Sequence, residues 1–243
     1  MDELLLLSKN NIPFIGAQVD IHQPTISEIS LIGEENFLSG CQLLKFGKDQ
    51  LSEVDKNALA DKSDFEIFMS IMNSKEKLKY RNCVMMVLAL LFPTSAIKIT
   101  NSEIVLVSSE KTARINEMNY DEFKNIVDAM FGLSGPDGAG EKYNPADSRA
   151  AKIAEKLKKG KQKAQQAKAR GEGKVAVFSR YVSILAVGEH KNINELMNYT
   201  VYQIRDEFKR FQMKQSFDAY MNARLAGAKD LEDVDNWMDD IHS

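Results

Sequence analysis

Apolar positions recur at the spacing of one helix face along much of the chain. Four apolar side chains fall on one side of a helix in residues 64–72, and another four do so in residues 119–131. The second half of 75–91 is apolar on every side, which predicts a buried central helix that Pro93 ends. Helices are predicted at residues 34–44, 64–72, 75–91, 119–131, 178–187 and 200–226.

Two pairs of polar residues predict where helices begin. Thr25 is followed three residues later by Glu28, and Thr200 by Gln203, and both pairs match a capping box. In such a box the two side chains satisfy backbone amides of the first helical turn reciprocally. The first box predicts a short helix that ends at Gly33, because glycine is the residue that most readily ends a helix.

Weaker signals set the other helix ends. Asn119 with Glu122 predicts the start of one helix, and Ser74 is a candidate cap for the helix at 75–91. Gly227 is expected to stop the long C-terminal helix.

Two regions favour strands. Residues 12–22 are rich in Ile, Val and Phe and predict one short strand. The alternating stretches 96–100 and 103–107 flank Asn101 and Ser102, a spacer that suits a hairpin turn. The predicted fold class is therefore mainly α, with a small β-hairpin in the N-terminal part.

A glycine-rich segment divides the chain. Residues 132–140 hold four glycines and a proline, which is typical of a linker. The predicted parts are an N-terminal helical domain at 1–131, a linker at 132–144, a basic helix with a C-terminal helical domain at 145–227, and an acidic tail at 228–243.

Charge is balanced overall but uneven locally. The 243 residues carry a formal net charge of −3, which argues against a general nucleic-acid binder. Residues 149–174, however, hold ten basic side chains and two acids. This stretch either docks on phosphate or on an acidic protein face, or is a solvated helix. A further alternative is that the acidic tail folds back on it, within the same chain or between chains. The candidate contact residues within it are Lys152, Lys156, Lys159 and Lys163.

No residue pattern predicts catalysis, a cofactor or a metal. The three histidines lie far apart in sequence, and Cys41 and Cys83 follow no metal-binding spacing and are expected to be buried. The glycine-rich segment follows a helix rather than a strand, which is the wrong context for a phosphate loop. We therefore expect a binding protein and not an enzyme.

Aromatic residues supply the second set of candidate partner contacts. An aromatic stripe runs through the last predicted helix and is either core or interface. Trp237 lies in the acidic tail and is expected to anchor the tail on a surface of its own chain or of a partner. The candidate contacts are Tyr199, Tyr202, Phe208, Phe211 and Trp237.

The first residues do not resemble a signal peptide. Four leucines follow two acids, with no basic region before them and no small-residue cleavage site after them. The longest apolar run, 84–92, is about half the length of a membrane span. We expect a cytosolic protein without a membrane anchor.

Two segments carry a resemblance to a known family. IHQPTISEISLIGEENFLSGCQLL at 21–44, and the C-terminal run from FSRYVSILAVGEHKNINELMNYTVYQIRDEFKRF to ARLAGAKDLEDVDNWMDDIH, resemble tail assembly chaperones of phages and prophages of Gram-positive bacteria. The resemblance implies a chaperone in the host cytoplasm that binds the tape-measure protein and helps recruit tail-tube subunits.

The sequence leaves two other functions open. One is a structural tail or baseplate protein of the virion, and the other is a phage nucleic-acid-binding or regulatory protein that uses the basic helix 149–174. The same basic helix could support self-association into a homo-oligomer.

Overall fold

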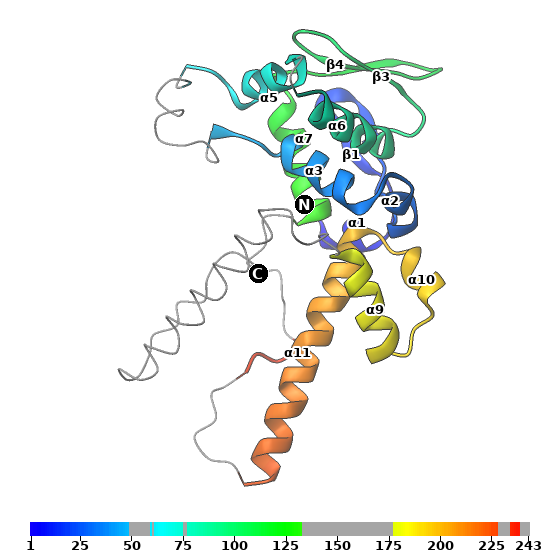
Figure 1. Cartoon of the computed structure of the whole chain (residues 1–243), viewed down its shortest axis with the longest axis vertical. Helices are drawn as coiled ribbons and strands as arrows, with labels where there is room; N and C mark the ends of the chain where they lie inside the picture. The colour runs from blue at the N-terminus through cyan, green and yellow to red at the C-terminus, as the bar shows by residue number, and fades with distance from the viewer. Residues whose placement is uncertain (49–58, 60, 75–76, 133–176, 228–233, 239–243) are drawn as a thin grey trace.

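Helices make up most of the secondary structure in the computed structural model of the chain (Figure 1). The structure describes residues 1–48, 59, 61–74, 77–132, 177–227 and 234–238. The helices are α1 (Glu3–Leu7), α2 (Ile26–Ile32), α3 (Glu34–Leu44), α5 (Asp64–Asn73), α6 (Leu78–Leu91), α7 (Tyr120–Phe131), α9 (Phe178–Gly188), α10 (Ile193–Met197) and α11 (Val201–Leu225). The mainly helical fold class is confirmed.

The predicted capping boxes are present. The hydroxyl of Thr25 accepts from the amide of Glu28, and the carboxylate of Glu28 accepts from the amide of Thr25. Thr200 and Gln203 make the same two bonds at the start of α11. Gly33 ends α2 with a φ of 84°, a backbone conformation that glycine adopts without strain.

The first strand region is a hairpin and not one strand, so that prediction was wrong in part. Strands β1 (Ile12–Phe14) and β2 (Val19–Ile21) pair antiparallel. A 3₁₀ turn at Ile15–Ala17 and a left-handed residue, Gln18, reverse the chain between them. Ten residues of mixed apolar and polar character therefore contain two strands of three residues each.

The predicted second hairpin is confirmed and is extended by a third strand. The strands β3 (Ala96–Ile99), β4 (Ile104–Val107) and β5 (Thr112–Ile115) form an antiparallel sheet in that order. The register pairs Ile99 with Ile104, and Ile104 with Ile115. The inner face of this sheet buries Ile104, Leu106, Ala113 and Ile115.

The core joins almost all of these elements. Helices α3 and α6 approach closely at Gly40, where an added Cβ would lie 2.6 Å from the carbonyl oxygen of Cys83. Cys41 and Cys83 are free and buried, as expected, and burial raises the pKa of the Cys41 thiol well above its ordinary value. The hydroxyl of Tyr120 donates to the carbonyl of Leu44 at 2.9 Å, so the largest fully buried side chain has its polar atom paired.

Two predicted helix starts need correction. Helix α6 begins at Leu78 after Lys77, which makes no side-chain cap bond, and Ser74 instead ends α5. Asn119 precedes α7 but does not cap it, because its side-chain oxygen accepts from the amide of Asn116 instead. The carboxylate of Glu122 instead accepts from the amides of Ile15 and Gly16.

Helices α9 to α11 share the same hydrophobic core as the N-terminal part. Phe37 on α3 contacts Phe131 and Phe178, with ring centroids 5.0 and 5.9 Å apart. The carboxylate of Glu34 accepts from the amides of Val177 and Phe178, so it caps α9 from another helix. The division into domains at 1–131 and 145–227 stays a prediction, and residues 133–144 of the linker lie outside the described residues.

Long-range bonds also fix the N-terminal hairpin. The carboxylate of Glu122 accepts from the amides of Ile15 and Gly16 at 3.0 and 2.9 Å, and Asn119 donates to the carbonyl of Gly16 at 3.0 Å. The turn between β1 and β2 is thereby held against the first turn of α7.

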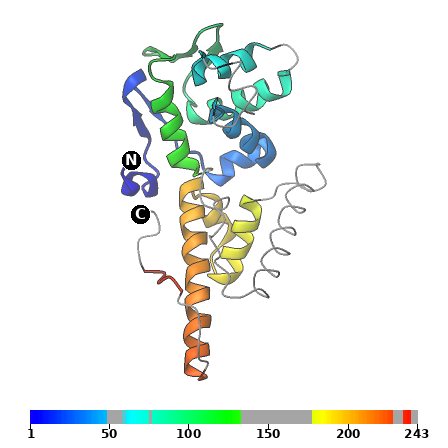
Figure 2. The ribbon, with the colours of Figure 1, turned by 90° about the vertical axis from the view of Figure 1, so that its left-hand side faces the viewer.

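Among the described residues, no helix combines the length and the apolar character needed to cross a membrane. Helix α11 is the longest of the described helices, and its C-terminal part projects away from the others (Figures 1 and 2).

Candidate partner-binding groove

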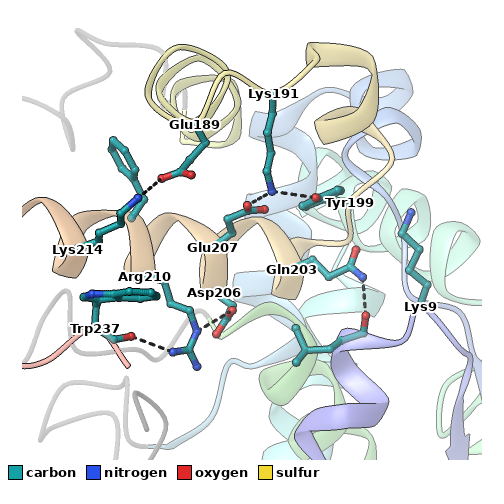
Figure 3. A pocket seen from close by; sticks show the side chains of 12 residues that line it. Lys9, Glu189, Lys191, Tyr199, Gln203, Asp206, Glu207, Arg210, Lys214 and Trp237 are labelled. Carbon is teal, nitrogen blue, oxygen red and sulfur yellow. Dashed lines mark hydrogen bonds and ion pairs between the residues drawn. The ribbon is translucent and has the colours of Figure 1, made fainter. Parts of the chain in front are cut away.

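A groove of about 660 Å³ runs along α11 (Figure 3). Its walls come from α11, the end of α1, the segment between α9 and α10, and residues 234–238. We call it the α11 groove, and it is lined by Leu7, Lys9, Glu189, Lys191, Tyr199, Gln203, Asp206, Glu207, Arg210, Phe211, Lys214 and Trp237.

Helix periodicity places six of these side chains on one face of α11. Positions 203, 206, 207, 210, 211 and 214 follow at intervals of three and four, so they lie on neighbouring turns of the same side. The capping box at Thr200 sets where the helix begins. A local signal in the sequence therefore determines which face of α11 lines the groove.

The end of α1 is fixed by two glutamine side chains. Gln203 donates to the carbonyl of Leu7 at 2.6 Å (Figure 3). Gln23 donates to the carbonyls of Leu5 and Asn10 at 3.1 and 2.7 Å. These bonds bracket Lys9, whose φ of 60° is uncommon for a residue with a side chain, and place it at the rim of the groove.

Lys191 is the most highly connected cation in the groove. Its ammonium group donates to the hydroxyl of Tyr199 at 3.2 Å and to the carboxylate of Glu207. It also lies 5.4 Å from the centroid of the Tyr199 ring. Burial by itself lowers the pKa of Lys191, but its bonds to Glu207 and Tyr199 outweigh that effect and raise the pKa above its ordinary value.

Arg210 links α11 to the C-terminal segment. Its Nε lies 3.4 Å from a carboxylate oxygen of Asp206, one turn earlier in the helix. Its Nη1 donates to the backbone carbonyl of Trp237 at 3.2 Å (Figure 3). The bond to Trp237 recognises a main-chain atom, so it leaves the indole side chain of Trp237 free for other contacts.

Each carboxylate of the groove has a cation near it. Glu207 pairs with Lys191, Asp206 with Arg210, and Glu189 lies 4.0 Å from Lys214. The last distance is at the outer limit of an ion pair, so Lys214 is only weakly neutralised. With Lys9 in addition, the lining has four cations and three carboxylates.

The structure brings three of the predicted aromatic contacts to the groove and leaves two beside it. Tyr199, Phe211 and Trp237 line the groove. Phe208 stacks on Tyr181, with centroids 4.1 Å apart, and does not line the groove. Tyr202 is half-buried and packs against the core.

Phe211 owes its position to a glycine. A Cβ added at Gly188 would lie 2.4 Å from the Phe211 ring, so a larger residue at the end of α9 would displace the ring from its present position. The partner-binding role of these aromatic residues stays a prediction.

Lys152, Lys156, Lys159 and Lys163, and the whole stretch 149–174, lie outside the described residues. The groove cations Lys9, Lys191 and Arg210 were not predicted. The spacing of Asp206 and Arg210 was the one local signal for them, whereas nothing near Lys9 in the sequence pairs it with α11.

The histidines are not brought together in the described part of the chain. The Nε2 of His22 lies 3.0 Å from the carboxylate of Glu28, which also holds Thr25 in the first capping box. Across the described ranges, no group of three His, Cys, Asp or Glu side chains could hold a metal ion. The groove itself offers paired charges, one extra cation and aromatic surface.

A family model matches part of the chain. Residues 165–242, about a third of the chain, match a family model described as YomV second domain. No curated protein and no solved structure matches the chain. The matched family is phage-related, with its namesake in a Bacillus prophage, and the match covers α9, α10, α11 and the segment with Trp237. It supports a phage-related protein and includes most of the residues that line the α11 groove.

Proposed function

We propose that the protein is a tail assembly chaperone of a phage or prophage. In this role it acts without catalysis in the host cytoplasm, binds segments of the tape-measure protein and helps recruit tail-tube subunits. The phage-related match at 165–242 supports the phage setting. The resemblance of residues 21–44 and of the C-terminal run to tail assembly chaperones supports the specific role.

The exposed apolar side of α11 is the observation that carries the proposal. Only Val201 and Ile204, in the first turn, are buried in this 25-residue helix. Further along, Phe217 and Met221 follow at helical spacing on one side, and Met221 is 40% exposed. Leu225, in the last turn, is 81% exposed. We call Phe217, Met221 and Leu225 the distal face.

A helical client fits this face. A tape-measure protein is long and helical, and its apolar stripes need cover until the tail tube surrounds them. Amphipathic helices bind partners through anchors spaced three, four and seven residues apart, and the distal face has two successive steps of four. Methionine adds a flexible and polarizable contact that tolerates varied partners. The projecting part of α11 can therefore pair with successive client segments of different sequence.

Co-expression with a fragment of the neighbouring tape-measure gene tests the proposal. The expected result is that the full-length chain raises the soluble fraction of the tape-measure fragment several-fold. A double variant, Phe217→Ser with Met221→Ser, should abolish most of that gain. The matched control is Gln215→Ser with Ala219→Ser, because both residues are exposed on the opposite side of the same helix.

Two outcomes would replace the proposal. An unchanged soluble fraction, together with the protein in purified virions, would favour a structural tail component. DNA binding with a steep salt dependence that is lost when Lys152, Lys156, Lys159 and Lys163 become glutamine would favour a nucleic-acid-binding role.

A further inference from the structure

We propose that the α11 groove is a binding site for an extended acidic peptide segment that carries a large aromatic side chain. Residues 234–238 of the same chain, whose Trp237 lines the groove, are the resident segment, and a partner segment of similar chemistry takes their place (Figure 3). This proposal concerns the groove and not the distal face, so it does not depend on the chaperone function.

The charge of the groove favours an acidic ligand. Its three carboxylates already have cations beside them. Lys9 has no hydrogen-bonding or ionic partner among the residues that the structure describes, although it stands at the rim. A ligand carboxylate that reached Lys9 would gain a charge-assisted bond without breaking any existing pair.

The resident segment shows how a peptide is held. Arg210 donates to the carbonyl of Trp237, which fixes the peptide backbone without selecting its sequence. The indole of Trp237 is half-buried and lines the groove together with Phe211, which supplies aromatic surface. Asp235 is exposed and Met238 is 65% exposed, so the flanking side chains leave part of the lining open.

The segment is long enough to reach the groove of its own chain. From Leu225 back to Arg210 the helix spans about 22 Å, at roughly 1.5 Å per residue. Gly227 ends the helix with a left-handed φ of 87°, and an extended chain from Gly227 to Trp237 spans about 33 Å. The segment can therefore turn back along α11.

The contact is also weak enough to exchange. Among the described residues, one side-chain hydrogen bond of 3.2 Å and the partial burial of one ring hold Trp237. A partner segment that also engaged Lys9 would compete with it. The groove would then bind partners only when they outcompete the resident segment.

Trp237 is the only tryptophan of the chain, so the tryptophan fluorescence reports on the groove directly. Emission and acrylamide quenching of the intact chain should be compared with those of a synthetic peptide of residues 230–243. We expect bluer emission and at least a two-fold smaller quenching constant in the intact chain. Identical spectra and quenching would overturn the proposal.

Competition tests the ligand chemistry. A peptide of residues 230–243 with the substitution W237F contains no tryptophan, so it does not add to the fluorescence. Its addition should raise the quenching constant of Trp237 in the intact chain to the value of the free peptide. A peptide with Asp235, Asp239 and Asp240 changed to Asn should compete at least five-fold less well, and so should one with W237A. Equal competition by all three peptides, or by none, would refute this ligand class.

Two lysine variants locate the charge effect. Lys9→Gln should weaken competition by the acidic peptide several-fold and reduce its salt dependence, whereas Lys98→Gln, on the exposed side of β3, should change neither. Equal effects of both variants would contradict the role of Lys9. A different outcome would be that Trp237 becomes more protected from quenching as the protein concentration rises and dimers form. That result would place the tail of a second copy in the groove, and it would overturn the proposal that residues 234–238 lie in the groove of their own chain.

Discussion

Thr25 and Thr200 form an isolated antiparallel β-bridge, although 175 positions separate them in the sequence. Each threonine also opens a helix through its own capping box. Beside the bridge, the amide of Ile26 donates to the carbonyl of Tyr199 at 2.9 Å. The starts of α2 and α11 are therefore held together, and this pairing fixes α11 and its groove relative to the N-terminal helices.

Replacing Thr200 should test the cap and the bridge together. Thr200 is 1% exposed, and Thr200→Ala removes the acceptor for the amide of Gln203. We expect a loss of about 1–2 kcal/mol in the free energy of unfolding, measured by urea denaturation. Thr200→Ser keeps the hydroxyl and should lose less than half of that amount. An alanine variant as stable as the wild type would show that the cap contributes nothing to α11.

The aromatic cluster around Phe37 should be the most sensitive contact between α3, α7 and α9. Phe37 is fully buried, and its ring contacts both Phe131 and Phe178. Phe37→Ala should lower the free energy of unfolding by about 3–5 kcal/mol, because it leaves a cavity that the neighbouring rings cannot fill. Leu31→Ala is the control, since Leu31 is 85% exposed, and it should change stability by less than about 0.5 kcal/mol. A change of similar size in both variants would contradict the assignment.

Asp64 should give the protein an acid-sensitive stability. Burial by itself raises the pKa of Asp64, but its bonds to Lys124 at 2.6 Å and to the amide of Lys48 at 2.9 Å outweigh burial and lower the pKa below 3.8. A carboxylate whose pKa is lower in the folded state than in the unfolded state stabilises the fold at pH values above its ordinary pKa. That stabilisation is lost as the pH falls from about 3.8 through the lowered pKa.

The comparison of Asp64→Asn with the wild type isolates this effect. Denaturation midpoints measured between pH 5 and pH 2 should fall more steeply for the wild type than for the variant in the acidic part of the range. Asp20→Asn, at an exposed position on β2, should follow the wild type. Parallel curves for Asp64→Asn and the wild type would refute the contribution of Asp64.

Local signals in the sequence predicted the elements whose ends are fixed by nearby residues. The two capping boxes, Gly33 and the hairpin at Asn101 are of this kind, because the bonds that define them span only a few residues. Helices α1 and α10 were missed since each has five residues, fewer than a reliable helical pattern needs. Strand β5 was missed because Ala113 and Arg114 give it little strand character.

Contacts between distant segments explain the rest. Glu122 has the sequence position of a helix-start residue, yet it binds the amides of Ile15 and Gly16, over one hundred positions away. The α11 groove is of the same kind, since Lys9, Lys191 and Trp237 come from three separate segments. The sequence predicted three aromatic residues of the groove. The charged residues of the groove could not be predicted, because the fold brings them together from separate segments.

The junction at Gly132 joins the end of α7 to Arg205 on α11. Gly132 follows α7 with a left-handed φ of 50°, and a Cβ there would lie 1.8 Å from the guanidinium group of Arg205. That group donates to the carbonyl of Phe131, one of the helix-end carbonyls that lack a partner within α7. Gly132→Ala therefore adds backbone strain and displaces Arg205.

We expect Gly132→Ala to lower the free energy of unfolding by about 1–3 kcal/mol in chemical denaturation. Arg205→Ala should lower it as well, and the double variant should lose less than the sum of the two single losses, because both changes disrupt the same bond. Gly227→Ala is the matched control, since Gly227 also has a left-handed φ but has nothing within 4 Å of its added Cβ. Gly227→Ala should introduce the backbone strain, and its loss should add to that of Arg205→Ala. If the losses of Gly132→Ala and Arg205→Ala were also additive, the position of Arg205 would not depend on Gly132.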